Sequence, residues 1–184
     1  MPIKRDTYPI NIAGIHRELR LFEVQPGLRI AILNILGDTE LVQACASALS
    51  ERLKELDYNC LVTAEAKSIP LIHALSVETK QPYVVLRKKY RPYMGVAISA
   101  ETISITTGSP QVLYLDEKDQ ELLKGSRVVL LDDVVSTGST LNGMRLLMEQ
   151  AGAKVAGEAS ILTEGDSSEW VHVISLGHLP LFRD

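Results

Sequence analysis

The apolar and polar positions of this chain alternate between a helical and a strand period. From Asp38 onward the spacing is helical, with Asp38 placed as an N-cap. The apolar face of this helix is formed by Leu41, Cys45, Ala48, Leu49, Leu53 and Leu56. Residues 59–66, NCLVTAEA, instead form a short apolar run that is typical of a buried strand. A helix is therefore followed by a strand, and the same succession recurs further along.

The later segments continue this alternation. Pro70 suits the first turn of a helix over residues 69–78, and Gly152 stands where a helix over residues 139–150 would end in a left-handed turn. Residues 90–107 contain prolines, a glycine and mostly polar alternation, which indicates a ribbon or a mobile loop. Further strands are predicted over residues 82–88, 111–116, 128–131, 153–162 and 170–177.

Alternating strands and helices with Val/Ile-rich strands predict an α/β fold, whose mostly parallel sheet is flanked by helices on both faces. We expect a single domain over residues 1–184, with its core in residues 38–184. Residues 1–37 fit the alternation less well and are expected to form a separate small layer. Ligands of such sheets bind beyond the carboxyl ends of the strands, so charged residues that follow the strands are candidate site residues.

The composition narrows the class of protein. A chain of 184 residues with 46% hydrophobic content can bury one substantial core. The net charge of −4 argues against a nucleic-acid partner, and no apolar run approaches the roughly 20 residues that span a bilayer. The start has no apolar segment of a secretory signal. Cys45 and Cys60 suit free thiols in a reducing compartment, so we expect a cytoplasmic protein with no membrane partner and no protein-held transition metal.

The stretch over residues 127–141, RVVLLDDVVSTGSTL, carries the strongest chemical signal. Its apolar run ends in two adjacent carboxylates, Asp132 and Asp133, and a short polar loop then opens a helix. Backbone N–H groups at a helix start have no internal partners, and the helix dipole adds positive charge, so this loop suits a phosphate monoester. Gly138 allows a close backbone approach, and hydroxyls are available from Ser136, Thr137, Ser139 and Thr140.

The two carboxylates would repel a phosphate, so they must serve another part of the same ligand. Ionised carboxylates only accept hydrogen bonds, which leaves two candidate partners: the hydroxyls of a ribose 5-phosphate, or water on a bound Mg²⁺. The plain alternative is an ordinary strand–turn–helix with a Ser/Thr cap and two solvated aspartates. The loop lacks the Gly-Lys-Ser/Thr ending of a Walker loop and the spacing of a G-x-G-x-x-G dinucleotide turn.

The same stretch resembles the phosphoribosyl diphosphate signature of type I phosphoribosyltransferases. VTAEAKSIPL, at residues 62–71, is similar to the diphosphate-binding turn of that family, and PYVVLRKK, at residues 82–89, to the strand entering its flexible loop. AGAKVAGEASIL resembles the strand that follows. The match covers roughly residues 38–162 and is nearest to the adenine and xanthine phosphoribosyltransferase branch. The resemblance implies a type I phosphoribosyltransferase-like fold with a small N-terminal hood, a flexible loop over about residues 89–110, and a homodimer.

The resemblance also implies an activity: Mg²⁺-dependent transfer of ribose 5-phosphate from phosphoribosyl diphosphate to a purine-type base, adenine first, in nucleotide salvage. It places Asp132 and Asp133 at the ribose as catalytic groups and, through water, at Mg²⁺. The implied phosphate and ribose contacts are Val135, Ser136, Thr137, Gly138, Ser139 and Thr140. The implied diphosphate contacts are the backbone around Ala66 and Lys67 and the side chain of Arg87. Lys88 and Lys89 follow the same strand and are further candidates for the diphosphate, or for contact with a neighbouring subunit. The candidate base contacts are Val134, Leu181 and Phe182.

The chain departs from the family at positions that bear on proton transfer. Adenine enzymes often carry a glutamate–tyrosine pair where this chain has Thr106 and Thr107, and hypoxanthine–guanine enzymes place an aspartate where Ser136 stands. Lys67 occupies a position where an arginine is common. A missing acid/base group weakens proton transfer by roughly 10²–10⁴-fold. The second hypothesis is therefore a non-catalytic module of the same fold that senses phosphoribosyl diphosphate or a nucleotide.

A phosphoacceptor receiver domain is a third class that can show paired aspartates. It should place a lone acidic acceptor at a later strand, and the sequence offers none there.

Overall fold

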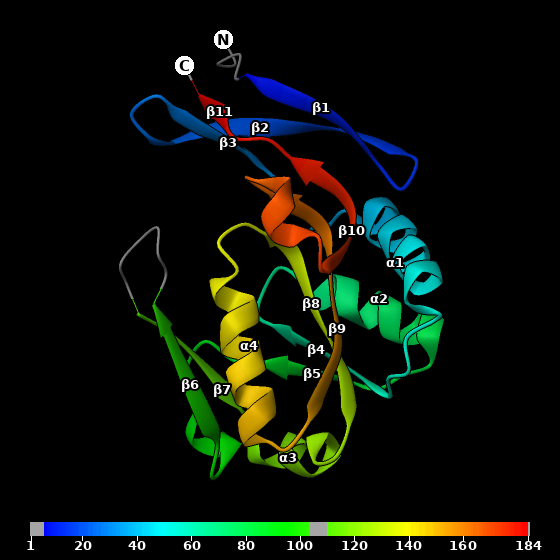
Figure 1. The fold of residues 1–184 in the computed structure, drawn as a ribbon, viewed down its shortest axis with the longest axis vertical. Helices are drawn as coiled ribbons and strands as arrows, with labels where there is room; N and C mark the ends of the chain where they lie inside the picture. Colours follow the sequence, from blue (N-terminus) through cyan, green and yellow to red (C-terminus); the bar gives the residue numbers. More distant parts are fainter. Residues whose placement is uncertain (1–5, 104–109, 184) are drawn as a thin grey trace.

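The computed structural model describes residues 6–103 and 110–183 of the chain (Figure 1). Within these residues the centre is a 5-stranded sheet with the order β10-β9-β8-β4-β5, in which every neighbouring pair is parallel. The parallel sheet expected from the sequence is confirmed. Its strands are β4 (Cys60–Ala64), β5 (Tyr83–Leu86), β8 (Arg127–Val135), β9 (Lys154–Glu164) and β10 (Val173–Leu179).

Helices cover both faces of this sheet. The described helices are α1 (Thr39–Leu53), α2 (Ile69–Thr79), α3 (Glu117–Leu123) and α4 (Ser139–Gln150). On β8, Val129 and Leu131 enter the core that contains α1 and α2, whereas Val128 and Leu130 enter the core that contains α4. All four side chains are fully buried. Because each burial contributes about 1.5–3 kcal/mol, the strand that carries the acidic pair is held firmly from both sides.

The helix boundaries largely follow the sequence pattern. Asp38 caps α1, because its Oδ1 accepts the backbone N–H of Leu41 at 3.2 Å. Gly152 follows α4 with a φ of +71°, the expected left-handed stop. Helix α3 was not expected, since it is short and buries only Leu123 among its residues. No helix in the described part of the chain is long and apolar enough to span a membrane.

The residues before Asp38 form a separate antiparallel sheet, as expected, and this sheet lies above the parallel one in Figure 1. It contains β1 (Thr7–Ile12), β2 (Ile15–Gln25), β3 (Leu28–Ile32) and β11 (Phe182–Arg183). Strand β11 comes from the far end of the sequence and pairs with β3, with Phe182 opposite Arg29. The inner face of this N-terminal sheet, including Ile12 and Leu19, joins the same core as α1.

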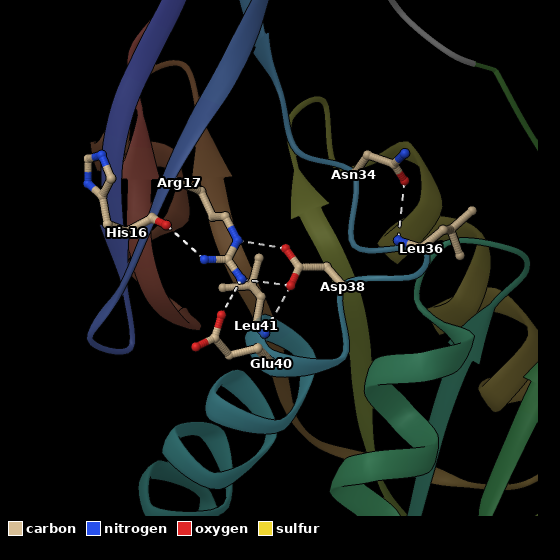
Figure 2. A network of polar contacts seen from close by, with 7 residues as sticks. All are labelled: His16, Arg17, Asn34, Leu36, Asp38, Glu40 and Leu41. Carbon is tan, nitrogen blue, oxygen red and sulfur yellow. Dashed lines mark hydrogen bonds and ion pairs between the residues drawn. The ribbon is translucent and has the colours of Figure 1, made fainter.

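Arg17 of β2 ties the N-terminal sheet to α1 (Figure 2). Its Nε and Nη2 donate to the two carboxylate oxygens of Asp38, both at 2.8 Å, and Nη2 also donates to Glu40 at 2.8 Å. The guanidinium holds the pKa of Asp38 below its ordinary value. Because Asp38 is also the cap of α1, one carboxylate joins the sheet to the start of the helix.

The segment predicted as a ribbon or loop forms a ribbon in its described part. Strands β6 (Ile98–Ile103) and β7 (Pro110–Leu115) pair in antiparallel fashion and pack against α4. The short 3₁₀ turn η1 (Pro92–Met94) precedes them. Residues 104–109, which include Thr106 and Thr107, lie outside the described residues.

Several boundaries differ from the sequence prediction, and the following ones concern the site. Strand β4 ends at Ala64 rather than at residue 66, and β8 continues past Leu131 to Val135, so the acidic pair lies inside the strand. Trp170 was expected in a strand but lies in the 3₁₀ turn η2 (Ser167–Trp170). The turn forms because Asp166 accepts hydrogen bonds from the backbone N–H and the hydroxyl of Ser168.

Candidate active site

Two cavities meet at the carboxyl ends of β4 and β8. One of about 220 Å³ is lined by residues 136–140, the anion loop. The other, of about 180 Å³, is lined by residues 64–68 at the end of β4 and in the turn after it. Asp132, Val134 and Thr140 line both cavities. A ligand with an anionic group at each end can therefore pass Asp132 and reach both cavities.

Ser68 holds the two carboxylates in place. Its Oγ lies 3.1 Å from Asp132 Oδ1 and 3.3 Å from Asp133 Oδ1, and it accepts the backbone N–H of Asp133 at 3.0 Å. The same N–H lies 2.9 Å from Asp132 Oδ1. A hydroxyl has one proton to donate, so Ser68 can serve only one carboxylate at a time while contacting both.

Burial raises the pKa of Asp132, and the adjacent carboxylate of Asp133 raises it further. Both effects disfavour the charged form. Lys67 forms an ion pair with the other carboxylate, since its Nζ lies 3.3 Å from Asp133 Oδ2. That oxygen is buried and accepts no hydrogen bond from the described residues. The pair therefore favours a ligand that donates hydrogen bonds or carries positive charge.

The anion loop bends at Gly138 and opens α4. Gly138 has a φ of +70°, which favours glycine, and a Cβ atom there would lie 2.9 Å from Cη2 of Trp170. Thr137 Oγ1 lies 3.1 Å from Ser139 Oγ and accepts the backbone N–H of Ser139 at 3.4 Å, and the N-cap Gly138 itself makes no side-chain cap hydrogen bond. The remaining backbone N–H groups of the first turn of α4 are available to an anion in the adjoining cavity.

Lys67 and Lys88 are the predicted diphosphate residues that the structure brings to the acidic pair. Together with Ala66 they line the same cavity of about 180 Å³ as Asp132 and Asp133. Their two ammonium groups come from the ends of neighbouring strands, β4 and β5. Positive charge is thus available on the side of Asp132 away from the anion loop.

Arg87 lies on the other side of Glu65. Its Nε donates to Glu65 Oε2 at 2.6 Å, and the backbone N–H of Lys88 donates to Oε1 at 2.7 Å. The contact with Glu65 raises the pKa of Arg87. Arg87 lines a cavity of about 500 Å³ that shares Glu65 with the cavity of about 180 Å³ but contains neither Asp132 nor Asp133. Lys89 is exposed and lines none of the three cavities. The structure therefore does not bring Arg87 and Lys89 to the acidic pair.

The three candidate base residues are not gathered in one place. Val134 lines both cavities beside Asp132. Phe182 lies in β11, with its ring 5.1 Å from that of Tyr8 in an edge contact, and packs against the core. Leu181 precedes it, and neither residue lines the cavities beside Asp132. Packing against Tyr8 and the core explains the position of Phe182 without any ligand. A contact of Leu181 or Phe182 with the base stays a prediction.

Sequence reasoning missed four residues of the site. Ser68 and Glu65 lie within residues 62–71, the segment similar to the diphosphate-binding turn of the family. The pattern of apolar and polar residues does not reveal their hydrogen-bond partners. Gln111 of β7 lines the cavity of the anion loop, and no spacing relates it to that loop. Trp170, expected in a strand, lies in the turn η2 and packs against Gly138.

The chain is similar to known phosphoribosyltransferases. The family model for the phosphoribosyl transferase domain matches residues 32–172. A hypoxanthine/guanine phosphoribosyltransferase of Methanothrix thermoacetophila is 36% identical over 120 residues, which cover 65% of this chain and 60% of the relative. A protein of the same name from Methanococcus voltae is 32% identical over 140 residues, covering 76% of this chain and 71% of the relative.

Similarity to solved structures extends over more of the chain. The crystal structure of an adenine phosphoribosyltransferase from Thermoanaerobacter pseudethanolicus is 20% identical, with a TM-score of 0.67, and the match covers 94% of this chain and 95% of that chain. At 20% sequence identity, this similarity shows only that the two chains share a fold. The chain spans about 60% of the length of the first curated relative, so the activity of the relatives is a separate question from the fold.

Proposed function

This chain belongs to the type I phosphoribosyltransferase family, and we propose that it transfers ribose 5-phosphate from phosphoribosyl diphosphate to a purine-type base, with release of diphosphate. The observation that carries the proposal is the meeting of two cavities at Asp132. One cavity borders the start of α4, whose N-cap is a glycine, and the other is lined by two lysines. Phosphoribosyl diphosphate has an anionic group at each end of a ribose, which matches this arrangement.

The phosphate of the ribose binds at the first turn of α4, where backbone N–H groups and the hydroxyls of the anion loop donate to it. The ribose hydroxyls donate to Asp132 and Asp133, because ionised carboxylates only accept. The diphosphate lies beside Lys67 and Lys88. When Lys67 turns to the diphosphate, it leaves Oδ2 of Asp133 to the sugar hydroxyls.

In the reaction a nitrogen of the base attacks C1 of the ribose. The bond from C1 to the diphosphate oxygen breaks, its electron pair leaves with the diphosphate, and the base nitrogen loses a proton to solvent or to a neighbouring group. Positive charge builds on the ribose ring, where the two carboxylates stabilise it. Lys67 and Lys88 stabilise the departing diphosphate, and the fixed positions of these groups contribute through orientation.

The residues at this site fit a hydrated Mg²⁺. Asp133 Oδ2 is buried without a hydrogen bond from the described residues, and Asp132 adjoins it. No group of three or more His, Cys, Asp or Glu side chains in the described residues could hold a metal ion. We therefore propose that Asp132 and Asp133 hold Mg²⁺ through water, as this ion keeps much of its hydration. When bound, Mg²⁺ would supply charge neutralisation of the diphosphate.

The identity of the base is a finer proposal. We place adenine first because the motifs of the sequence resemble those of the adenine and xanthine branch. The curated relatives carry the name hypoxanthine/guanine phosphoribosyltransferase, so hypoxanthine and guanine are the next candidates. A cytoplasmic location and a homodimer stay predictions. The burial of the free thiols Cys45 and Cys60 supports a reducing compartment.

The test is diphosphate release from phosphoribosyl diphosphate in the presence of Mg²⁺, with adenine, hypoxanthine, guanine and xanthine supplied one at a time. We expect release that depends on one or two of these bases. Tight binding of phosphoribosyl diphosphate with no release for any base would contradict the enzyme and favour the sensing module. The absence of both binding and release would contradict the site itself.

A further inference from the structure

Trp170, the one tryptophan of the chain, packs against the backbone of the anion loop. A Cβ atom at Gly138 would lie 2.9 Å from Cη2 and 3.1 Å from Cζ3 of its indole. Both atoms belong to the six-membered ring, so the far edge of the indole faces the glycine. The loop therefore has a rigid aromatic surface behind it at the residue where it bends.

The opposite edge of the indole is fixed to the central sheet. Its Nε1 donates to the backbone carbonyl of Glu164 at 2.9 Å, and Glu164 is the last residue of β9. The ring is half-buried and packs against the core that contains α4. Asp166 fixes the turn that carries Trp170, since it accepts from Ser168 at 2.9 Å and 2.7 Å. The ring position is thus set by β9.

Strand β9 also holds α4 directly. Arg145 of α4 donates through Nε and Nη2 to the two carboxylate oxygens of Glu158, at 2.5 Å and 2.7 Å, and Glu158 is buried. A bidentate contact of this kind fixes orientation as well as distance. The helix is therefore tied to β9 through Arg145, and the loop that precedes the helix is tied to β9 through Trp170.

We propose that Trp170 is a positioning residue for the phosphate site. Its ring fixes the backbone of Gly138, so that the N–H groups of the first turn of α4 stand ready for a phosphate before the ligand arrives. Donors that are already ordered cost no further ordering on binding. The inference rests on the proposed function, because that function identifies the ligand as a phosphorylated ribose. Trp170 itself does not touch the ligand and acts through the backbone of the anion loop.

The test compares Trp170→Ala with the unaltered chain and with Tyr58→Ala. Tyr58 is a half-buried aromatic residue next to the amino end of β4, packed against the core and far from the carboxyl edge of the sheet. Ribose 5-phosphate binding is measured by calorimetry. KM and kcat are measured with phosphoribosyl diphosphate as substrate, and stability is measured by thermal unfolding. Trp170→Phe, which keeps an aromatic ring but has no N–H, is the milder variant should Trp170→Ala fail to fold.

We expect Trp170→Ala to weaken ribose 5-phosphate binding by about tenfold, as a loss of preorganised donors would. KM for phosphoribosyl diphosphate should rise by a similar factor while kcat stays within about twofold, because the phosphate contact is equal in the ground and transition states. Ribose 5-phosphate binding by Trp170→Phe should be intermediate between that of the unaltered chain and that of Trp170→Ala. Tyr58→Ala should unfold at a lower temperature and bind as before. In the unaltered chain, Trp170 fluorescence should change saturably with ribose 5-phosphate.

Unchanged binding in a folded Trp170→Ala would overturn the positioning role and leave the proposed function standing. The same holds if Tyr58→Ala weakens binding as much as Trp170→Ala does, because the effect would then follow from lost stability alone. An unaltered chain that binds no ribose 5-phosphate would overturn both the positioning role and the proposed function.

Discussion

Lys67 Nζ lies 3.3 Å from Asp133 Oδ2, so an ion pair links the turn after β4 to the end of β8. In the proposed reaction Lys67 contacts the diphosphate and Asp133 contacts the ribose. When the diphosphate attracts the ammonium of Lys67, the carboxylate of Asp133 becomes free to accept the sugar hydroxyls. When the sugar hydroxyls bind the carboxylate first, the ammonium becomes free to contact the diphosphate. The two ends of the ligand should therefore bind cooperatively at this ion pair.

The first prediction concerns Asp133. Asp133→Asn keeps the shape of the side chain and removes its charge. We expect kcat/KM for phosphoribosyl diphosphate to fall by roughly 10²–10³-fold, the range seen when one group that stabilises transition-state charge is removed. Asp57→Asn is the matched control, since Asp57 is 83% exposed and pairs with Arg127 at 3.3 Å. It should leave turnover unchanged, and retained activity in Asp133→Asn would remove the ribose contact.

The second prediction concerns the stability of Asp132→Asn. Burial and Asp133 raise the pKa of Asp132 in the folded chain above its value in the unfolded chain. The stability that this group contributes is therefore present below its unfolded pKa, about 3.9, and is lost as the pH rises through the raised pKa. Asparagine does not titrate, so Asp132→Asn should be more stable than the unaltered chain at pH 8.

The size of this effect follows from linkage. Each unit by which the pKa is raised corresponds to about 1.4 kcal/mol at a pH above both values. Urea unfolding at pH 4 and pH 8 should show a difference between the two chains that is larger at pH 8. A difference that does not change with pH would mean that Asp132 titrates normally in the folded chain. The variant should nevertheless be inactive, because the removed charge serves catalysis.

The third prediction compares two glycines. Gly138 and Gly152 have φ values of +70° and +71°, but a Cβ atom at Gly152 meets nothing within 4 Å, whereas one at Gly138 meets Trp170. Gly152→Ala should cost about 1–2 kcal/mol, the penalty of the left-handed conformation for other residues. Gly138→Ala should cost more by about 1–3 kcal/mol, because the ring must move, and should also weaken ribose 5-phosphate binding. Equal losses in the two variants, measured by urea unfolding, would mean that the ring yields freely.

The fourth prediction concerns the contact between the N-terminal sheet and α1 (Figure 2). Arg17→Met keeps an apolar stem and removes the hydrogen bonds to Asp38 and Glu40. We expect a lower midpoint of urea unfolding, since the contact is bidentate although partly exposed. Lys54→Met is the control, because its ion pair with Glu51 is well exposed and should matter little.

The same pair gives a pH dependence. Arg17 lowers the pKa of Asp38, so the stability that this contact contributes is present above the unfolded pKa of the carboxyl and is lost as the pH falls through the lowered value. The difference between the unaltered chain and Arg17→Met should therefore be full at pH 7 and shrink toward pH 2. A difference that persists at low pH would show that packing, and not charge, holds the sheet.

The acidic pair and the anion loop could be predicted from the sequence because their residues are consecutive. Asp132, Asp133 and Gly138 lie within one strand–turn–helix, where local spacing determines what each residue faces. Ser68 could not be predicted in the same way. Its contacts with Asp132 and Asp133 join residues 64 and 65 positions apart, and only the pairing of β4 with β8 brings them together.

The basic residues show the same limit. Lys67, Arg87 and Lys88 all follow strands of the central sheet, as the sequence predicts, but the strand order does not determine the direction of each side chain. Glu65 holds Arg87 at a cavity that contains neither Asp132 nor Asp133. Strand β11 could not be foreseen either, because two residues carry no periodicity and their partner β3 lies near the other end of the sequence.

Strand β11 has a consequence for the order of folding. Until residues 182 and 183 emerge from the ribosome, the edge of β3 has no neighbour on that side, and its backbone N–H and C=O groups stay open to other chains. If translation pauses after the parallel sheet has been synthesised but before β11, the open edge of β3 could pair with a strand of another ribosome-bound copy.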